Sequence, residues 1–150
     1  KEIYDGAMPS GNSVAARELM GLARLTGDTE LQEVAEKIIR AFASQVLHYP
    51  AGHTHLLQAL LLALVPGREA VVVGELDHPE IRQLLQEVQR SFLPEVSVLA
   101  AADPQELAHV APFTAGIKST LGTQVYLCQN NACGLPETDI ARIRTQLLQS

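Results

Sequence analysis

The stretch DGAMPSGNS, residues 5–13, is the first place in the chain where residue types and spacing could support chemistry. Gly6 and Gly11 are spaced as in the phosphate-binding pattern G-x-x-x-x-G-K-[ST], but Asn12 stands where that pattern has its lysine. A phosphate-binding loop also follows a buried strand, and the preceding KEIYD is a poor strand sequence. We therefore expect no nucleotide site here.

The same stretch is explained better as the start of a helix. Ser10, Asn12 and Ser13 are residue types that cap helices. The unpaired N–H groups at a helix start favour an anion or a hydroxyl-rich ligand. Capping without any ligand explains the same residues, and the sequence leaves both alternatives open.

Three histidines, His48, His53 and His55, lie close together in HYPAGHTH. A zinc site needs three or four converging ligands, and no Cys, Asp or Glu lies nearby in the sequence to complete one. We interpret this segment as a polar loop followed by a helix start, and we predict no metal site.

A strand-to-helix turn is predicted at residues 73–75, VGE, where a doubly wound fold would bind a dinucleotide. The fingerprint G-x-G-x-x-G is missing, and Glu75 and Asp77 would repel phosphate. We therefore predict an ordinary turn and no cofactor.

Cys128 and Cys133, in YLCQNNACGLPETD, are the only cysteines of the chain. Their C-x-x-x-x-C spacing differs from the C-x-x-C of a redox helix or a zinc ribbon. We expect two buried, inert thiols, at the end of a parallel strand and in the loop after it. A reversible disulfide is the alternative, and it makes Cys128 and Cys133 the redox candidates.

Residues up to about 65 have helical periodicity. Helices are expected over residues 12–25, from Thr29 to a break at 48–52, and over about 53–64, with Gln32 in capping-box position after Thr29. The third helix is apolar nearly all round, as in helices buried on several sides. We expect partner helices upstream that this chain lacks.

The pattern changes after Pro66 and Gly67. Strands are expected at 70–73, 96–99 and 124–128, and helices at about 79–92, 103–110 and 137–148. Because strands alternate with helices, we predict parallel pairing through right-handed crossovers. The predicted fold is mixed: an α-helical segment over residues 1–66, then a small α/β sandwich over residues 67–150 with a three-stranded, mainly parallel sheet.

Composition narrows the classes of partner. The formal net charge is −6 and Lys and Arg do not cluster, which argues against nucleic acid. The longest apolar run is too short to span a bilayer, and the first residues do not form a signal peptide. With only two cysteines, we expect a cytoplasmic protein that binds no membrane.

Three stretches carry a resemblance to a known family: YDGAMPSGNSVAA at 4–16, AVVVGE at 70–75 and VYLCQNNACGLPETD at 125–139. In this order they resemble the C-terminal region of the YyaL-like (spermatogenesis-associated) family of thioredoxin-domain-containing proteins. The similarity covers essentially the whole chain, and the motif with the paired cysteines is the most specific.

The resemblance implies a thioredoxin-like domain, then an (α/α)6 toroid of the N-acylglucosamine 2-epimerase type, then a small α/β segment. This chain would hold the last toroid helices and that α/β segment, and its partners would be the upstream domains. Because toroid clefts are lined by helix ends, the resemblance implies that Tyr4, Asp5, Ser10 and Asn12 border a carbohydrate-type cleft. It assigns no catalytic residue, and we expect a chain that is not catalytic alone.

The uncovered apolar helix predicts that the chain self-associates through its helical half. As an alternative function, the α/β segment would serve protein interaction or thiol redox without being an enzyme.

Overall fold

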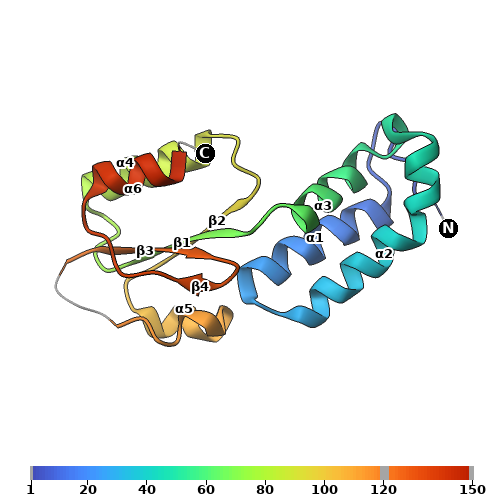
Figure 1. The fold of residues 1–150 in the computed structure, drawn as a ribbon. Helices are drawn as coiled ribbons and strands as arrows, with labels where there is room; N and C mark the ends of the chain where they lie inside the picture. The colour runs from blue at the N-terminus through green and yellow to red at the C-terminus, as the bar shows by residue number, and fades with distance from the viewer. Residues whose placement is uncertain (1, 119–121, 149–150) are drawn as a thin grey trace. The chain divides into compact units, whose positions relative to one another are not determined.

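The computed structural model describes residues 2–118 and 122–148. The chain forms two compact units, Lys1–Pro66 and Gly67–Ser150. Figure 1 shows that the first unit is helical and that the second combines a sheet with helices. The chain is therefore mixed α/β, as the sequence predicts.

The helical unit contains α1 (Gly11–Thr26), α2 (Thr29–His48), the short 3-10 turn η1 (Pro50–Gly52) and α3 (Thr54–Leu64). Ser10 caps α1, because its Oγ accepts the N–H of Ser13 at 3.1 Å. Asp28 caps α2 by accepting the N–H groups of Glu30 and Leu31, so the predicted capping box at Thr29 is wrong. An aspartate immediately before the helix supplies the stronger acceptor.

Small and aliphatic side chains form the core of this unit. Its two buried clusters contain Ile3, Ala16, Met20, Ala35, Phe42, Val46, Leu56, Ala59 and Leu62. The guanidinium of Arg24, near the end of α1, donates to the carbonyl groups of Leu62 and Val65. Arg24 thereby satisfies carbonyl groups that the end of α3 leaves without an intrahelical partner.

The α/β unit carries four strands, β1 (Arg68–Val73), β2 (Val96–Ala101), β3 (Gln124–Gln129) and β4 (Ala132–Cys133). Its helices are α4 (Pro79–Arg90), α5 (Pro104–Val110) and α6 (Ile140–Leu148), with the 3-10 turn η2 at Pro112–Thr114. The strand order is β2-β1-β3-β4.

The predicted three-stranded, mainly parallel sheet is wrong in both strand number and direction. β1 pairs with β2 in parallel, but β3 runs antiparallel to β1, with Val71 opposite Tyr126, and β4 runs antiparallel to β3. The seven-residue helix α5 is about half as long as a six-residue strand. The chain therefore re-enters the sheet at the same end of the strands at which β2 finishes. From there β3 runs in the direction opposite to β1 and β2.

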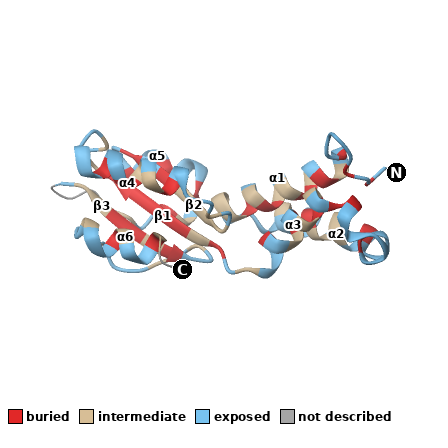
Figure 2. Cartoon of the chain, turned by 90° about the horizontal axis from the view of Figure 1, so that it is seen from above, coloured by how far each residue is buried: buried red, intermediate tan, exposed pale blue. Residues whose placement is uncertain are grey.

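The two faces of the sheet are covered by different helices (Figure 1). Helices α4 and α6 lie on one face and α5 lies on the other. The first face forms a continuous buried cluster of Ala70, Val72, Ile81, Leu84, Val88, Val125, Ile143 and Leu147. β1 and β3 are the two central strands of this sheet, and Figure 2 shows most of β1 as buried.

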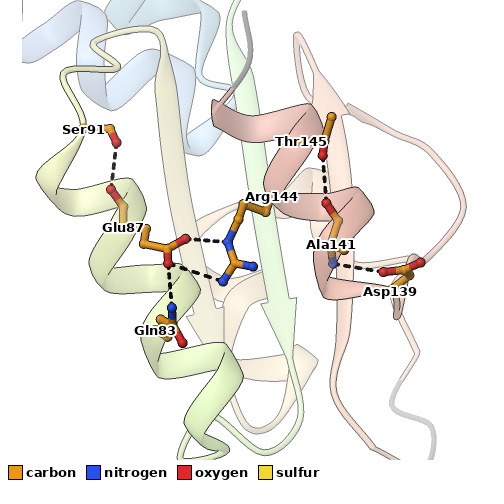
Figure 3. A network of polar contacts seen from close by, with 7 residues as sticks. All are labelled: Gln83, Glu87, Ser91, Asp139, Ala141, Arg144 and Thr145. Carbon is orange, nitrogen blue, oxygen red and sulfur yellow. Dashed lines mark hydrogen bonds and ion pairs between the residues drawn. The ribbon is translucent and has the colours of Figure 1, made fainter.

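An ion pair joins the two helices of that face (Figure 3). The carboxylate of Glu87 on α4 accepts two hydrogen bonds from the guanidinium of Arg144 on α6, at 2.6 and 3.3 Å, and a third from Gln83. The bonds from Arg144, and then that from Gln83, hold the pKa of Glu87 below its usual value. A two-pronged pair of this kind fixes helix register more firmly than a single contact.

Candidate functional site

Asp5, one of the predicted ligand-binding residues, is buried and ties two helix starts together. It is 8% exposed, and its Oδ1 accepts the N–H of Ser10 at 2.8 Å. Its Oδ2 accepts the N–H groups of His55 and Leu56 in the first turn of α3, at 2.9 and 3.2 Å. Asp5 is thus a helix cap that acts across the fold.

Burial and hydrogen bonding oppose each other at Asp5. Burial is the largest single influence and raises its pKa, but hydrogen bonds from the backbone of Ser10, the side chain of Ser13, and the backbones of Leu56 and His55 lower it. Together the hydrogen bonds prevail, so the pKa of Asp5 lies below its ordinary value. The carboxylate is therefore ionised at neutral pH.

The other three candidates lie near the same helix start, with different surroundings. The Oγ of Ser10 lies 2.9 Å from that of Ser13, and the side-chain amide of Asn12 donates to the carbonyl of Glu2 at 2.7 Å. Tyr4 is exposed. The structure brings Asp5 and Ser10 into direct contact, while Asn12 is bonded to the segment before them.

The histidine segment forms a distinct end of the helical unit. The Nδ1 of His53 lies 3.0 Å from the carbonyl oxygen of Ile3, and the His53 ring meets the ring of Tyr4 edge-on, with centroids 6.5 Å apart. His48 is exposed at the end of α2. Across residues 2–118 and 122–148, no group of three or more His, Cys, Asp or Glu side chains is arranged to hold a metal ion.

A hollow of about 640 Å³ opens beside these residues, and the sequence did not point to it. It is lined by Ser44, Gln45, Leu47, His48, Tyr49 and His53. The useful signal was the tripeptide His48-Tyr49-Pro50, which places an aromatic ring at the break between two helices. Helix ends and their loops are common places for binding sites.

The two cysteines form a disulfide, with the sulfur atoms 2.05 Å apart, so the prediction of two free thiols is wrong. Asn130 and Asn131 have φ angles of 50° and 63°, which build a two-residue turn between β3 and β4. This turn places Cys133 directly opposite Cys128. The dipeptide Asn-Asn was the overlooked signal, because asparagine tolerates positive φ.

Glu69 is a second feature that the sequence analysis missed. It lies on β1 opposite Cys128, is almost completely buried, and its Oε2 accepts the N–H of Asn131 at 3.0 Å. A carboxylate inside a strand is normally buried only when it is paired. Glu69 therefore holds the turn that closes the disulfide.

The strand-to-helix turn after β1 is closed by neighbouring backbone. Gly74 has a φ of +114°, and a Cβ there would lie 2.6 Å from the carbonyl oxygen of Gly122. The Oγ1 of Thr123 donates to the carbonyl of Glu75 at 3.0 Å. Only glycine fits at position 74, and its function is to let two segments of backbone meet.

These observations define a class of protein. It has a three-helix unit in which one carboxylate caps two helix starts, followed in the chain by an α/β unit with a mixed sheet and a hairpin closed by a disulfide. Comparison with known proteins narrows it. The chain is 30% identical to rat spermatogenesis-associated protein 20 over 152 residues, which is 99% of this chain and 19% of the relative. It is 29% identical to the human protein over 150 residues, with the same share of that relative.

The chain is thus homologous to one part of spermatogenesis-associated protein 20, and it spans about a fifth of the length of these relatives. An uncharacterized protein of Caenorhabditis elegans is 22% identical over 135 residues. No family model matches the chain. No solved structure matches it.

Among the described residues, no helix is both long enough and apolar enough to cross a membrane.

Proposed function

We propose that this chain works as one part of a larger protein, in which its helical unit packs against further helices. The observation that carries this proposal is a row of leucines on α3: Leu57, Leu60, Leu61 and Leu64. They follow the spacing i, i+3, i+4, i+7, which places them on one face of the helix. Leu61 is 48% exposed and Leu64 is 73% exposed.

The opposite face of α3 already has its partners. Leu56, Ala59 and Leu62 are buried in the core of the unit. Within the row, Leu57 still packs partly against this core, whereas Leu61 and Leu64 are exposed. Exposed leucines next to a finished core are typical of a surface that another protein segment covers. Further helices of the larger protein are the occupants that we propose, in keeping with the (α/α)6 toroid that the resemblance implies.

The leucine row can be tested in the 150-residue chain. We expect the chain to self-associate, and we expect Leu61→Gln with Leu64→Gln to make it monomeric in sedimentation velocity. The control is Phe92→Gln, which removes a side chain that is 91% exposed in the α/β unit. A wild-type chain that stays monomeric at high concentration would contradict the proposal, as would equal effects of both variants.

In that larger protein, we place one edge of a carbohydrate-type ligand cleft at Tyr4, Asp5, Ser10 and Asn12, with the other walls and the catalytic groups outside this chain. The supporting contact is that of Asp5, which brings the starts of α1 and α3 together. The larger protein would also carry a thioredoxin-like domain. The test is sugar binding by the longer protein, which Tyr4→Ser and Asn12→Ala should weaken. Unchanged binding in both variants would contradict this location of the cleft.

The disulfide favours a second candidate, a thiol-redox module without an enzyme activity of its own. A dithiol reductant would supply two electrons and two protons to the Cys128–Cys133 bond and leave as a disulfide. The module requires that this bond open while the chain stays folded. Alkylation after treatment with dithiothreitol should therefore label both cysteines without urea. Labelling that occurs only in urea would exclude a redox role.

A further inference from the structure

The hollow at the end of α2 is built entirely by this chain. Its lining residues all lie between positions 44 and 53. Two backbone hydrogen bonds fix the position of Tyr49: its N–H donates to the carbonyl of Gln45 at 3.0 Å, and its carbonyl accepts the N–H of Gly52 at 3.2 Å. The wall is therefore positioned by main chain, which favours a site formed before any ligand arrives.

An aromatic surface faces this hollow. Tyr49 is 53% exposed, although its ring lies against Gly52, where a Cβ would come within 2.6 Å of two ring carbons. The ring of Tyr4 lies against the same glycine, 3.0 Å from that Cβ position. Gly52 thus lets two tyrosine rings approach the backbone closely, and it holds the Tyr49 ring at the rim.

The most buried lining residue is held in place by a hydrogen bond to the segment before α1. His53 is buried, and its Nδ1 is bonded to the carbonyl of Ile3, so that the proton on Nδ1 is donated there. Its other ring nitrogen, Nε2, forms no hydrogen bond among the described residues and is left to bond with a ligand. Ser44 and Gln45 add a hydroxyl and an amide at the rim.

The chemistry of this lining points to one class of ligand. None of the six residues is an Asp, Glu, Lys or Arg, so no permanently charged side chain lines the hollow to pair with a full charge on a ligand. Exposed tyrosine, hydroxyl, amide and imidazole groups suit a ligand with apolar C–H faces and many hydroxyl groups. The volume of about 640 Å³ is within the range of small-molecule sites.

We propose that this hollow binds an uncharged, polyhydroxylated ring, either a free monosaccharide or the terminal residue of a glycan, stacked on Tyr49 and hydrogen-bonded by Gln45, Ser44 and His53. This site goes beyond the function proposed above, because it needs no helix from outside the chain and uses other residues than the cleft at the start of α1.

The experiment is a titration of the 150-residue chain with glucose, N-acetylglucosamine and a disaccharide, followed through the amide signals of residues 44–53 by NMR. Glucuronate and glucosamine serve as charged counterparts. We expect the neutral sugars to shift these signals at millimolar concentration and the charged sugars to bind more weakly. Tighter binding of the disaccharide identifies a glycan end, and equal binding identifies a free monosaccharide.

Three variants test the geometry. Tyr49→Leu should weaken binding about tenfold through loss of the stacking ring. Gln45→Ala should weaken it less, and Gly52→Ala should weaken it by displacing the ring of Tyr49. The matched controls are Phe92→Leu and Gln58→Ala, which remove an exposed ring and an exposed amide elsewhere.

The proposal is overturned if no sugar shifts residues 44–53, if the charged sugars bind as well as the neutral ones, or if Tyr49→Leu binds like Phe92→Leu. Each of these results leaves the leucine row of α3 untouched, since self-association is measured without sugar. Failure of this site and failure of the proposed function are therefore separate observations.

Discussion

Asp5 shows how one side chain can join segments that are 50 residues apart in the sequence. Its two oxygens accept three backbone N–H groups from two helix starts. The sequence placed Asp5 near a ligand because carboxylate, hydroxyl and amide groups gather around it. The residue types alone could not reveal that its acceptors are already engaged, since the partners in α3 are distant in the chain.

Replacing Asp5 measures how much its hydrogen bonds contribute to the free energy of unfolding. Asp5→Ala leaves buried N–H groups without an acceptor, so we expect a loss of about 2 kcal/mol in the free energy of unfolding. Urea unfolding followed by circular dichroism at neutral pH gives this value. The control Asp77→Ala removes a surface ion pair with Arg82 and should cost less than about 0.5 kcal/mol. Equal losses would contradict the capping role.

The stabilisation that Asp5 contributes should depend on pH. The pKa of Asp5 in the folded chain lies below the ordinary value of 3.8, so the carboxylate binds fewer protons when folded than when unfolded. Its stabilisation is complete well above pH 3.8 and is lost as the pH falls through the lower, folded pKa. The stability difference between wild type and Asp5→Ala should therefore shrink in acid. A constant difference down to acid pH would show that the charge of Asp5 contributes nothing.

At the scale of helices and strands, the hairpin of β3 and β4 depends on its cross-link. The disulfide closes a loop of sequence separation 5, and the chain-entropy relation then gives roughly 2 kcal/mol of stabilisation. We expect dithiothreitol to lower the free energy of unfolding of the wild-type chain, measured by urea unfolding, by this amount, and so to lower the urea midpoint. Cys128→Ser with Cys133→Ser should match the reduced wild type and should not respond to the reductant. An unchanged midpoint after complete reduction would mean that the turn alone holds the hairpin.

Element positions were predictable where periodicity is strong, and strand direction was not. The predicted start of α4 at Pro79 and of β2 at Val96 agrees with the structure, because a proline and a β-branched run mark them. The direction of β3 depends on where the chain re-enters the sheet after α5. Alternation of strands and helices carries no information on that path. The two-residue strand β4 is too short to show any period.

At the scale of the whole chain, each unit has its own core, and the relatives are about five times longer than this chain. Because the relatives are so much longer, we interpret the exposed leucines of α3 as a surface that further helices of a larger protein cover. The predicted cytoplasmic location stays a prediction, and one of its arguments is weaker. The cysteines are bonded to each other, and such bonds are uncommon in cytosolic proteins.

The segment before α1 has a practical consequence for anyone who trims this chain. A version that begins at Gly11 would still contain the complete sequences of the three helices of the first unit. It would lose the Ile3 side chain from the core, the Ile3 carbonyl that orients His53, and the Asp5 carboxylate that caps α3. The segment 2–10, which has no helix or strand, thus acts as a strap around the start of α3. Deletion mapping that starts at the first helix would mistake the loss of this segment for loss of function.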